Sequence, residues 1–291
     1  MRNEIFINNI KKPDCPPETR QVLPSLGGVG GGIMSEISPK AEISPKAKIG
    51  DNCKIFPFVY IEDDVVIGDN CIIFPFVSIL DGTRMGSHNK VHQGAVIGAL
   101  PQDFDFRGEK SECIIGDHNI IRENVVINRA THTGGQTVLG NENVLMEGAH
   151  ISHDTKVGNR CVFGYGTKIA GDCIIEDGAI FSSSVIENAK TRVGRAAMIQ
   201  AGTTFSKDVP PGIICTNHVQ YGGVNTTMCK YYGTDEKVLK HIANAYRLVF
   251  HGQTSLFDAI HQIEQQVPDS PEIRHIINFL KNSELGIITK L

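Results

Sequence analysis

Apolar residues recur at every sixth position over most of this chain, from Ile37 to Phe205. The phase consists of Ile37, Ile43, Ile49, Ile55, Ile61, Ile67, Ile73, Ile79, Met85, Val91, Ile97, Ile115, Ile121, Ile127, Leu139, Leu145, Ile151, Val157, Phe163, Ile169, Ile175, Phe181, Val193, Ile199 and Phe205. This period fits neither an α-helix nor a simple alternating strand. It fits a coil in which one large residue on each side points inward and a small residue two positions earlier turns the corner. Three sides make one turn, and stacked turns share one core. The pattern therefore predicts a mainly β fold, a left-handed parallel β-helix of hexapeptide repeats.

The phase is interrupted at four positions, which are Asp103, Glu109, Thr133 and Glu187. The first two lie in the segment 100–109 and the third lies in the segment 131–135, and both segments are predicted to be loops outside the prism. Loops on a rigid scaffold are where ligand contacts usually lie. Glu187 is different, because a carboxylate at an inward position is costly unless it is paired. We expect either a locally distorted coil there or a side chain that escapes the core.

Both ends of the chain depart from the repeat. Residues 1–33 contain several prolines and the glycine run 27–32, which predicts a flexible extension. Met34 directly precedes the first repeat, and one hypothesis is that translation of the native protein starts there. The predicted β-helix spans 34–211, a connector spans 212–233, and a C-terminal helical domain spans 234–291. Helical periodicity follows three expected N-terminal caps, which are Thr234, Ser255 and Ser270.

Composition narrows the class of protein without identifying it. The 291 residues are 41% hydrophobic and 21% charged, which is an ordinary globular balance. A net charge of −4 predicts no broad attraction to nucleic acid or to anionic membranes. No apolar run has transmembrane length and the first residues lack a signal-peptide core, so we expect a cytoplasmic protein. Five cysteines share the corner phase of the repeat, which favours small core residues over disulfides: Cys53, Cys71, Cys113, Cys161 and Cys173.

The segment His150-Ile151-Ser152-His153-Asp154 is the candidate for chemistry. Adjacent histidine and aspartate on an exposed wall can form a base and its orienting carboxylate, which fixes the imidazole tautomer. Two other interpretations remain open, namely solvated surface histidines and a metal site, although zinc would need further ligands. The chain contains no phosphate-binding loop, nucleophile elbow or Cys–His motif. Without a covalent nucleophile, direct attack of an acceptor on an acyl thioester is favoured.

Several motifs together resemble one family, the acyl-[acyl-carrier-protein]–UDP-N-acetylglucosamine O-acyltransferases of lipid A biosynthesis. The motifs are Pro101-Gln102-Asp103-Phe104 through Gly108-Glu109, Ile115-Gly116-Asp117 to Ile121-Arg122-Glu123, Ala149 to Asp154, Val157 to Cys161, Asp208 to Pro211, Gly223 to Asn225 and Asn244 to Leu248. The resemblance runs from about Met34 to the C-terminus and implies a homotrimer with sites between adjacent prisms. It implies that His153 is the general base, that Asp154 orients it, and that the backbone N–H of Gly171 stabilises the oxyanion. It also implies substrate-binding positions at Gln102, Asp103, His150, Asp172, Asn188, Ala201, His218 and Asn225. No metal and no organic cofactor is implied beyond the phosphopantetheine of acyl carrier protein.

The chain departs from the family pattern at several of these positions. Asp172 and Asn188 stand where the family has histidines, Asp105 replaces a lysine, and Tyr231-Tyr232 replace paired arginines. Fewer cations weaken the case for binding a pyrophosphate-linked sugar in the usual way. Ala201 aligns with a position, usually glycine, that limits acyl-chain depth, which predicts a shorter chain.

Three hypotheses follow for the function. The first is transfer of a 3-hydroxyacyl chain from acyl carrier protein to the 3-hydroxyl of UDP-N-acetylglucosamine. The second is a paralogous acyltransferase with a different nucleotide-sugar or amine acceptor and an acyl carrier protein or acyl-CoA donor, which the altered positions favour. The third is a non-catalytic trimeric scaffold, which does not require the His153-Asp154 pair that the chain retains.

Overall fold

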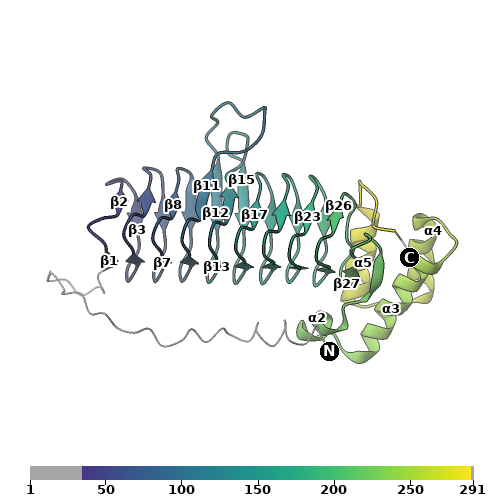
Figure 1. Ribbon diagram of the computed structural model, residues 1–291. Helices are drawn as coiled ribbons and strands as arrows, with labels where there is room; N and C mark the ends of the chain where they lie inside the picture. Colours follow the sequence, from purple (N-terminus) through teal and green to yellow (C-terminus); the bar gives the residue numbers. More distant parts are fainter. Residues whose placement is uncertain (1–34, 290–291) are drawn as a thin grey trace. The chain divides into compact units, whose positions relative to one another are not determined.

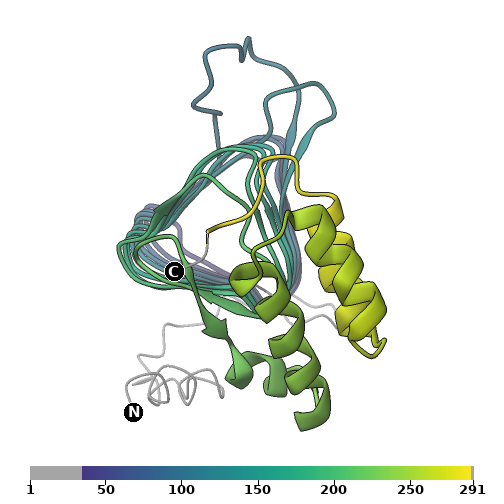
Figure 2. The same cartoon turned by 90° about the vertical axis from the view of Figure 1, so that its right-hand side faces the viewer.

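The computed structural model describes residues 35–289, so the expected flexible extension and the hypothetical start at Met34 lie outside the described residues. Residues 36–205 wind into a triangular prism whose walls are three sheets of short parallel strands (Figures 1 and 2). The chain visits the three walls in turn, so each strand pairs with strands one coil before and one coil after it. The predicted left-handed parallel β-helix is confirmed.

The three walls differ in the number of strands found within residues 35–289. One has 11 strands: β1 (Glu36–Ile37), β4 (Lys54–Ile55), β7 (Ile72–Ile73), β10 (Lys90–Val91), β13 (Ile120–Ile121), β16 (Val144–Leu145), β19 (Val162–Phe163), β22 (Ile180–Phe181), β25 (Met198–Ile199), β27 (Ile213–Cys215) and β28 (Tyr221–Val224). The second has nine: β2 (Glu42–Ile43), β5 (Tyr60–Ile61), β8 (Ser78–Ile79), β11 (Val96–Ala99), β14 (Val126–Asn128), β17 (His150–Ile151), β20 (Lys168–Ile169), β23 (Ile186–Glu187) and β26 (Thr204–Phe205). The third has eight: β3 (Lys48–Ile49), β6 (Val66–Ile67), β9 (Thr83–Met85), β12 (Glu112–Ile115), β15 (Gln136–Leu139), β18 (Lys156–Val157), β21 (Ile174–Ile175) and β24 (Arg192–Val193).

The six-residue period determines where the core lies. The large residue of each repeat points into the prism, and from Ile55 to Phe205 the residues of this phase are at most 3% exposed. The small residues two positions earlier are buried as well, for example Val59 at 0%. Ile37 is in phase but 47% exposed, because its coil forms the open end of the stack within the described part of the chain. The seven cysteines between Cys53 and Cys229 are free and buried.

A ladder of side-chain oxygens follows one edge of the prism and holds successive coils in register. Asp69 Oδ1 accepts the N–H of Asp51, and Asn159 Oδ1 accepts the N–H of Asn141, each 18 residues earlier and 2.8 Å away. In the other coils, the equivalent backbone N–H groups donate to side-chain oxygens of Ser87, Asp117, Asn141 and Asp177. These bonds satisfy backbone donors that a corner would otherwise leave unpaired.

Helices follow the last coils. They are α2 (Thr226–Tyr231), α3 (Glu236–His251), α4 (Leu256–Gln266) and α5 (Pro271–Lys281). Ser255 and Ser270 cap α4 and α5 as expected, whereas α3 is capped by Asp235 instead of Thr234. The Asp235 carboxylate accepts the N–H groups of Lys237 and Val238. None of these helices is long and apolar enough to cross a membrane, as far as residues 35–289 show.

The segment expected to be a connector contains ordered structure. Strand β27 pairs parallel to β25 and therefore continues one wall of the prism, and β28 pairs antiparallel to β27. The boundaries proposed for the β-helix, connector and helical domain remain a prediction.

The helices pack on the last coils through specific contacts. His275 Nε2 of α5 lies 2.7 Å from Glu176 Oε2 of the prism, and the Arg192 guanidinium lies 4.2 Å from the Phe279 ring centroid. Burial alone would raise the pKa of Glu176, but the bond and charge of His275 and the N–H of Arg195 hold that pKa below its usual range. The Tyr246 hydroxyl donates to the carbonyl of Pro211 at 2.5 Å.

Glu187 corrects both expectations drawn from its sequence position. Its strand pairs in register with Ile169 on one side and Phe205 on the other, so the coil is not distorted. Its side chain points inward and is 1% exposed, so it does not escape the core. Glu187 Oε1 lies 2.8 Å from Thr191 Oγ1, which also lies 2.8 Å from the carbonyl oxygen of Asn188.

These distances indicate that the Glu187 carboxyl carries a proton. The Thr191 hydroxyl has one proton, and a carbonyl oxygen can only accept, so the second bond needs a proton from the carboxyl. Burial, with the charge of Asp208 added, raises the pKa of Glu187 to about 8, in the same direction. A neutral carboxyl avoids the cost of a buried charge that sequence reasoning anticipated.

Candidate active site

Two loops project from one corner of the prism, as predicted from the interruptions of the repeat (Figures 1 and 2). The first, residues 100–111, joins β11 to β12, and the second, residues 129–135, joins β14 to β15. The loops are hydrogen-bonded to each other, since the N–H of Gly134 donates to the carbonyl of Lys110 at 2.9 Å. They stand beside the turn after β17, which carries His153 and Asp154.

His153 is held between two carboxylates. Its Nδ1 lies 3.0 Å from Asp154 Oδ2, and its Nε2 lies 3.6 Å from Asp103 Oδ2 on the first loop. The His153 side chain is 12% exposed, so the ring is largely shielded and reaches solvent at one edge. A carboxylate bonded to Nδ1 fixes the proton on that nitrogen and leaves Nε2 free to accept a proton. This arrangement fits the predicted base and its orienting residue.

The Asp154 carboxylate is held in turn by the second loop. Thr131 donates its backbone N–H at 3.1 Å and its hydroxyl at 2.8 Å to Oδ2. The backbone N–H of Asp154 donates to Thr137 Oγ1 at 2.8 Å, which fixes the turn. Asp154 has φ 59°, a conformation that Asp and Asn adopt more readily than most residues. Aspartate at position 154 therefore suits both the contact with His153 and the left-handed backbone conformation of the turn.

Gly171 lies one coil beyond His153, directly against its ring. The carbonyl of Gly171 accepts the N–H of Lys190 at 3.1 Å, and the next residue, Asp172, donates its N–H to the carbonyl of His153 at 3.1 Å. The Gly171 N–H has no hydrogen-bond partner among residues 35–289. A free N–H beside the base can donate to an oxygen of a bound ligand.

His150 is half-buried on the outer side of β17. Its Nε2 lies 2.6 Å from Asn128 Oδ1, while Asn128 donates its Nδ2–H to the carbonyl of Leu100 at the base of the first loop. Burial lowers the pKa of His150, and the charges of Lys168 and His153 lower it further. His150 is therefore favoured as a neutral ring that positions the loop. Gln102, next to Asp103, is exposed.

The remaining predicted positions fall into two groups. Asp172 follows β20 and Asn188 follows β23, so both lie on the corner line of His153, one and two coils further along, and both are exposed. Ala201 follows β25 on another wall, and His218 lies between β27 and β28; both are exposed. Within a single chain, Ala201 and His218 therefore do not lie at the corner of His153.

Asn225 is buried and its side chain is used within the protein. Its Nδ2–H donates to the carbonyl of Ala196 at 3.0 Å, and its Oδ1 caps α2 by accepting the N–H of Met228 at 3.4 Å. Tyr232, at the end of α2, packs against Gly178 and under the Arg160 guanidinium, 5.3 Å from the ring centroid. Tyr231 and Asp105 are exposed.

Sequence reasoning did not assign a role to His132 or Thr131. Both belong to the predicted second loop, and His132 was one of the histidines in the repeat region, so the residue types were visible. Their proximity to Asp154 depends on how the loop folds back, and the six-residue period carries no information about that.

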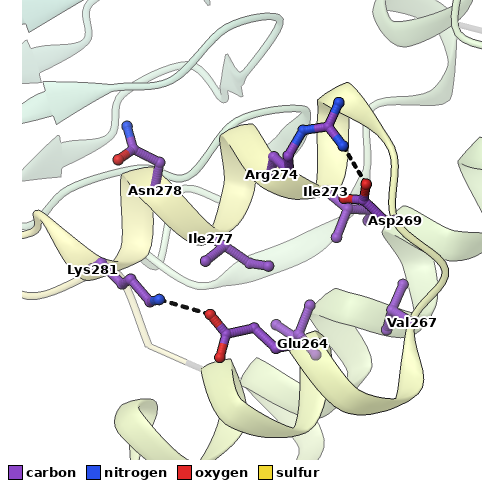
Figure 3. A pocket seen from close by; sticks show the side chains of 9 residues that line it. Glu264, Val267, Asp269, Ile273, Arg274, Ile277, Asn278 and Lys281 are labelled. Atoms are coloured by element: carbon purple, nitrogen blue, oxygen red, sulfur yellow. Dashed lines mark hydrogen bonds and ion pairs between the residues drawn. The ribbon is translucent and has the colours of Figure 1, made fainter.

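Residues 35–289 contain no cluster of three or more histidines, cysteines or carboxylates placed to hold a metal. A groove of 410 Å³ lies between α4 and α5 and contains none of the predicted site residues (Figure 3). Its floor includes Ile273 and Ile277, and ion pairs of Lys281 with Glu264 and of Arg274 with Asp269 close its rim. The histidine cluster at the prism corner is therefore the better candidate for chemistry.

Comparisons with known proteins identify the family that this chain resembles. Residues 208–288 match the family model described as UDP N-acetylglucosamine O-acyltransferase, domain 2. Residues 46–73, 66–99 and 136–171 match the bacterial transferase hexapeptide model. The chain is 33% identical over 202 residues to the acyl-[acyl-carrier-protein]–UDP-N-acetylglucosamine O-acyltransferase of Gloeothece citriformis, covering 69% of this chain and 73% of that protein.

Solved structures give the same result. The UDP-N-acetylglucosamine acyltransferase of Bacteroides fragilis is 49% identical, with a TM-score of 0.85 and coverage of 87% of this chain and 99% of that one. The UDP-N-acetylglucosamine acyltransferase of Francisella novicida is 32% identical, with a TM-score of 0.83 and coverage of 87% and 94%.

Proposed function

Because the chain belongs to the UDP-N-acetylglucosamine O-acyltransferase family, we propose that it transfers a 3-hydroxyacyl chain from acyl carrier protein to the 3-hydroxyl of UDP-N-acetylglucosamine, the first step of lipid A synthesis. The observation that carries the proposal is the shielded His153, with Nδ1 3.0 Å from Asp154 and its Nε2 edge directed toward the loop at Asp103. Membership makes the chain an acyltransferase. The acceptor, the donor and the role of each residue are our proposal.

The first chemical step is proton removal from the acceptor. His153 Nε2 takes the proton of the sugar 3-hydroxyl as that oxygen attacks the thioester carbonyl carbon. General-base catalysis of this kind contributes roughly 10²–10⁴-fold. The Asp154 carboxylate stabilises the imidazolium that forms, because its negative charge lies against Nδ1–H.

The second step is collapse of the tetrahedral intermediate. The former carbonyl oxygen carries the negative charge, and the unpartnered N–H of Gly171 is placed to donate to it. The C–S bond then breaks, and the imidazolium of His153 returns its proton to the departing thiolate of the phosphopantetheine arm. Atoms and protons balance without a metal or an organic cofactor.

Assembly into a homotrimer would complete the site. Ala201 and His218 lie on parts of the chain away from the corner line of His153. A second prism packed against that corner can contribute such residues, which supports a site between adjacent copies. We place the reaction in the cytoplasm, where acyl carrier protein and nucleotide sugars are made.

A different acceptor is the second candidate. Tyr232 stands where the family has an arginine, and its ring is packed on Gly178, so it supplies no cation to a pyrophosphate. Asp172 and Asp105 add negative charge at the corner that carries His153. These observations favour a less negatively charged acceptor, such as another sugar or an amine, with the same His153 chemistry.

The deciding experiment is turnover of radiolabelled UDP-N-acetylglucosamine with a panel of 3-hydroxyacyl carrier proteins. We expect product from the wild-type protein and at least a 100-fold loss with His153→Ala. His118→Ala, which changes an exposed histidine outside the corner, is the matched control and is expected to keep wild-type activity. A folded wild-type protein that makes no product with any donor would overturn the proposal and direct the assay to other acceptors.

A further inference from the structure

One oxygen of the Asp154 carboxylate lacks a well-aligned donor. Oδ2 is approached by three groups, namely the N–H and hydroxyl of Thr131 and Nδ1 of His153. Oδ1 is buried and accepts no aligned hydrogen bond within the described residues. The polar atom beside it is Nδ1 of His132, 3.1 Å away. Buried carboxylate oxygens are rarely left without a donor, so this ring nitrogen is its natural partner.

The position of His132 is determined by its own loop. A Cβ on Gly135 would lie 2.7 Å from Cε1 and Nε2 of His132, so the ring packs directly on the glycine backbone. The N–H of Gly135 donates to the carbonyl of His132 at 2.9 Å and closes the turn. The His132 side chain is 70% exposed, so its other edge faces solvent while Nδ1 faces the buried carboxylate.

We propose that His132 is a positioning residue for the acyl transfer: it donates Nδ1–H to Asp154 Oδ1 and divides this carboxylate between two imidazoles. The inference rests on the proposed role of His153 as the base. A donor on the second oxygen draws negative charge away from the oxygen that faces His153. His132 therefore sets how much negative charge faces Nδ1 of His153. His132 touches no reacting atom and acts through Asp154.

Other charged groups around His153 do not share this contact. Asp103 faces Nε2 from the first loop, at 3.6 Å. His150 lies on β17, just before the turn of His153, and Asp172 in the next coil donates its backbone N–H to the carbonyl of His153. Thr131 and Thr137 are uncharged. A change at His132 therefore reaches His153 through Asp154.

The test is the pH dependence of kcat/KM for the full-length protein with His132→Ala and His132→Asn. In His132→Ala we expect the midpoint of the acidic limb to move up by about one pH unit, because the carboxylate regains its full charge. Asparagine can place an amide N–H near the position of Nδ1, so His132→Asn is expected to keep the wild-type midpoint. A role limited to holding the loop would lower the rate equally at every pH, and an unmoved midpoint in His132→Ala would overturn the proposal.

A second measurement separates this inference from the proposed function. In protein labelled with ¹³C at histidine Cε1, the NMR titration midpoint of His153 is expected to rise in His132→Ala and to stay unchanged in the control His118→Ala. This readout does not require turnover. A shifted His153 midpoint in a protein without acyl transfer would refute only the proposed function. An unshifted midpoint in an active enzyme would refute only the role of His132.

Discussion

A Cβ added to Gly171 would lie 2.4 Å from Cε1 of His153. The two residues are 18 positions apart and occupy the same corner of successive coils. The imidazole therefore rests on the bare backbone of the next coil, beside the N–H group that is free to donate. Any side chain at position 171 has to displace the ring or the turn.

Gly171→Ala is expected to lower kcat/KM by about 100-fold, because a displacement of roughly 1 Å misplaces the base relative to the acceptor. Gly166→Ala is the matched control, since a Cβ there meets nothing closer than 3.8 Å. Gly166 has φ +66°, so the control is expected to lose about 1–2 kcal/mol of folding free energy while keeping its kcat/KM. Steady-state assays and urea unfolding of both variants check this. Equal activity of the two variants would contradict the close packing of Gly171 on His153.

Asp154→Asn is expected to lower kcat/KM at least 100-fold with little change in stability. The amide oxygen can still accept from Thr131, and asparagine tolerates the φ of 59° at this position. The variant lacks the charge that stabilises the imidazolium and can hold the wrong imidazole tautomer. Kinetics and thermal unfolding measured on one preparation provide the check. A kcat/KM within threefold of wild type would remove Asp154 from the proposed mechanism.

Glu187→Gln is expected to remove most of the loss of stability that occurs as pH rises toward 8. Because the pKa of Glu187 is raised to about 8 in the folded protein, the native state keeps a proton that the unfolded chain releases above its ordinary pKa of 4.5. Stability is therefore full below the unfolded pKa and falls as pH rises toward 8, by a total on the order of 5 kcal/mol.

Urea unfolding at pH 5.5 and pH 8.5 tests this difference. Wild type is expected to lose stability at the higher pH, and Glu187→Gln is expected to lose much less, since a neutral amide has no proton to release. Glu187→Val, which restores the apolar phase, is the second control. Identical pH profiles for all three proteins would show that Glu187 is not protonated in the core.

Ala201→Gly is expected to shift the acyl-length profile toward longer chains. Ala201 stands at the position that we expect, from the resemblance to the family, to limit the depth available to the acyl chain. We propose that its methyl group shortens that depth in this chain. Initial rates with 3-hydroxyacyl carrier proteins of increasing length measure the profile. A wild-type profile that already peaks at the longest chains used by the family would refute the assignment.

The fold could be predicted from the sequence because the rule that creates it is local and repeated. Most inward residues, such as Ile79 and Ile151, are the last residue of a short strand, and no long-range information is needed to assign them. Glu187 could not be interpreted in the same way. Its burial depends on Thr191 in the following turn and on a proton that residue types alone do not reveal.

The candidate site was predictable only where its residues are adjacent in sequence. His153 and Asp154 are neighbours on one turn, so their pairing followed from the motif. His132 reaches the same carboxylate from a loop 22 positions earlier, whose path is set by Gly135 and by contacts with Lys110. Asn225 matched a family position, but its amide is occupied by the cap of α2 and the carbonyl of Ala196.

The ladder of side-chain oxygens along the prism edge has a consequence for how such a chain can change its length. Each hydrogen bond of this ladder joins equivalent residues of successive coils, which are 18 positions apart where no loop intervenes, as for Asp51 and Asp69. The spacing grows to 30 between Ser87 and Asp117 and to 24 between Asp117 and Asn141, where the two loops interrupt the coils. Gain or loss of one whole coil leaves every remaining rung with an equivalent partner and moves the parts on either side by about 4.8 Å. Gain or loss of six or twelve residues keeps the inward phase but breaks the ladder, because the later strands move to another wall. Gain or loss of a number that is not a multiple of six also turns inward side chains toward solvent. Duplication or deletion in whole coils is thus the tolerated route of divergence, while excursions of arbitrary length are confined to loops outside the walls, as in residues 100–111 and 129–135.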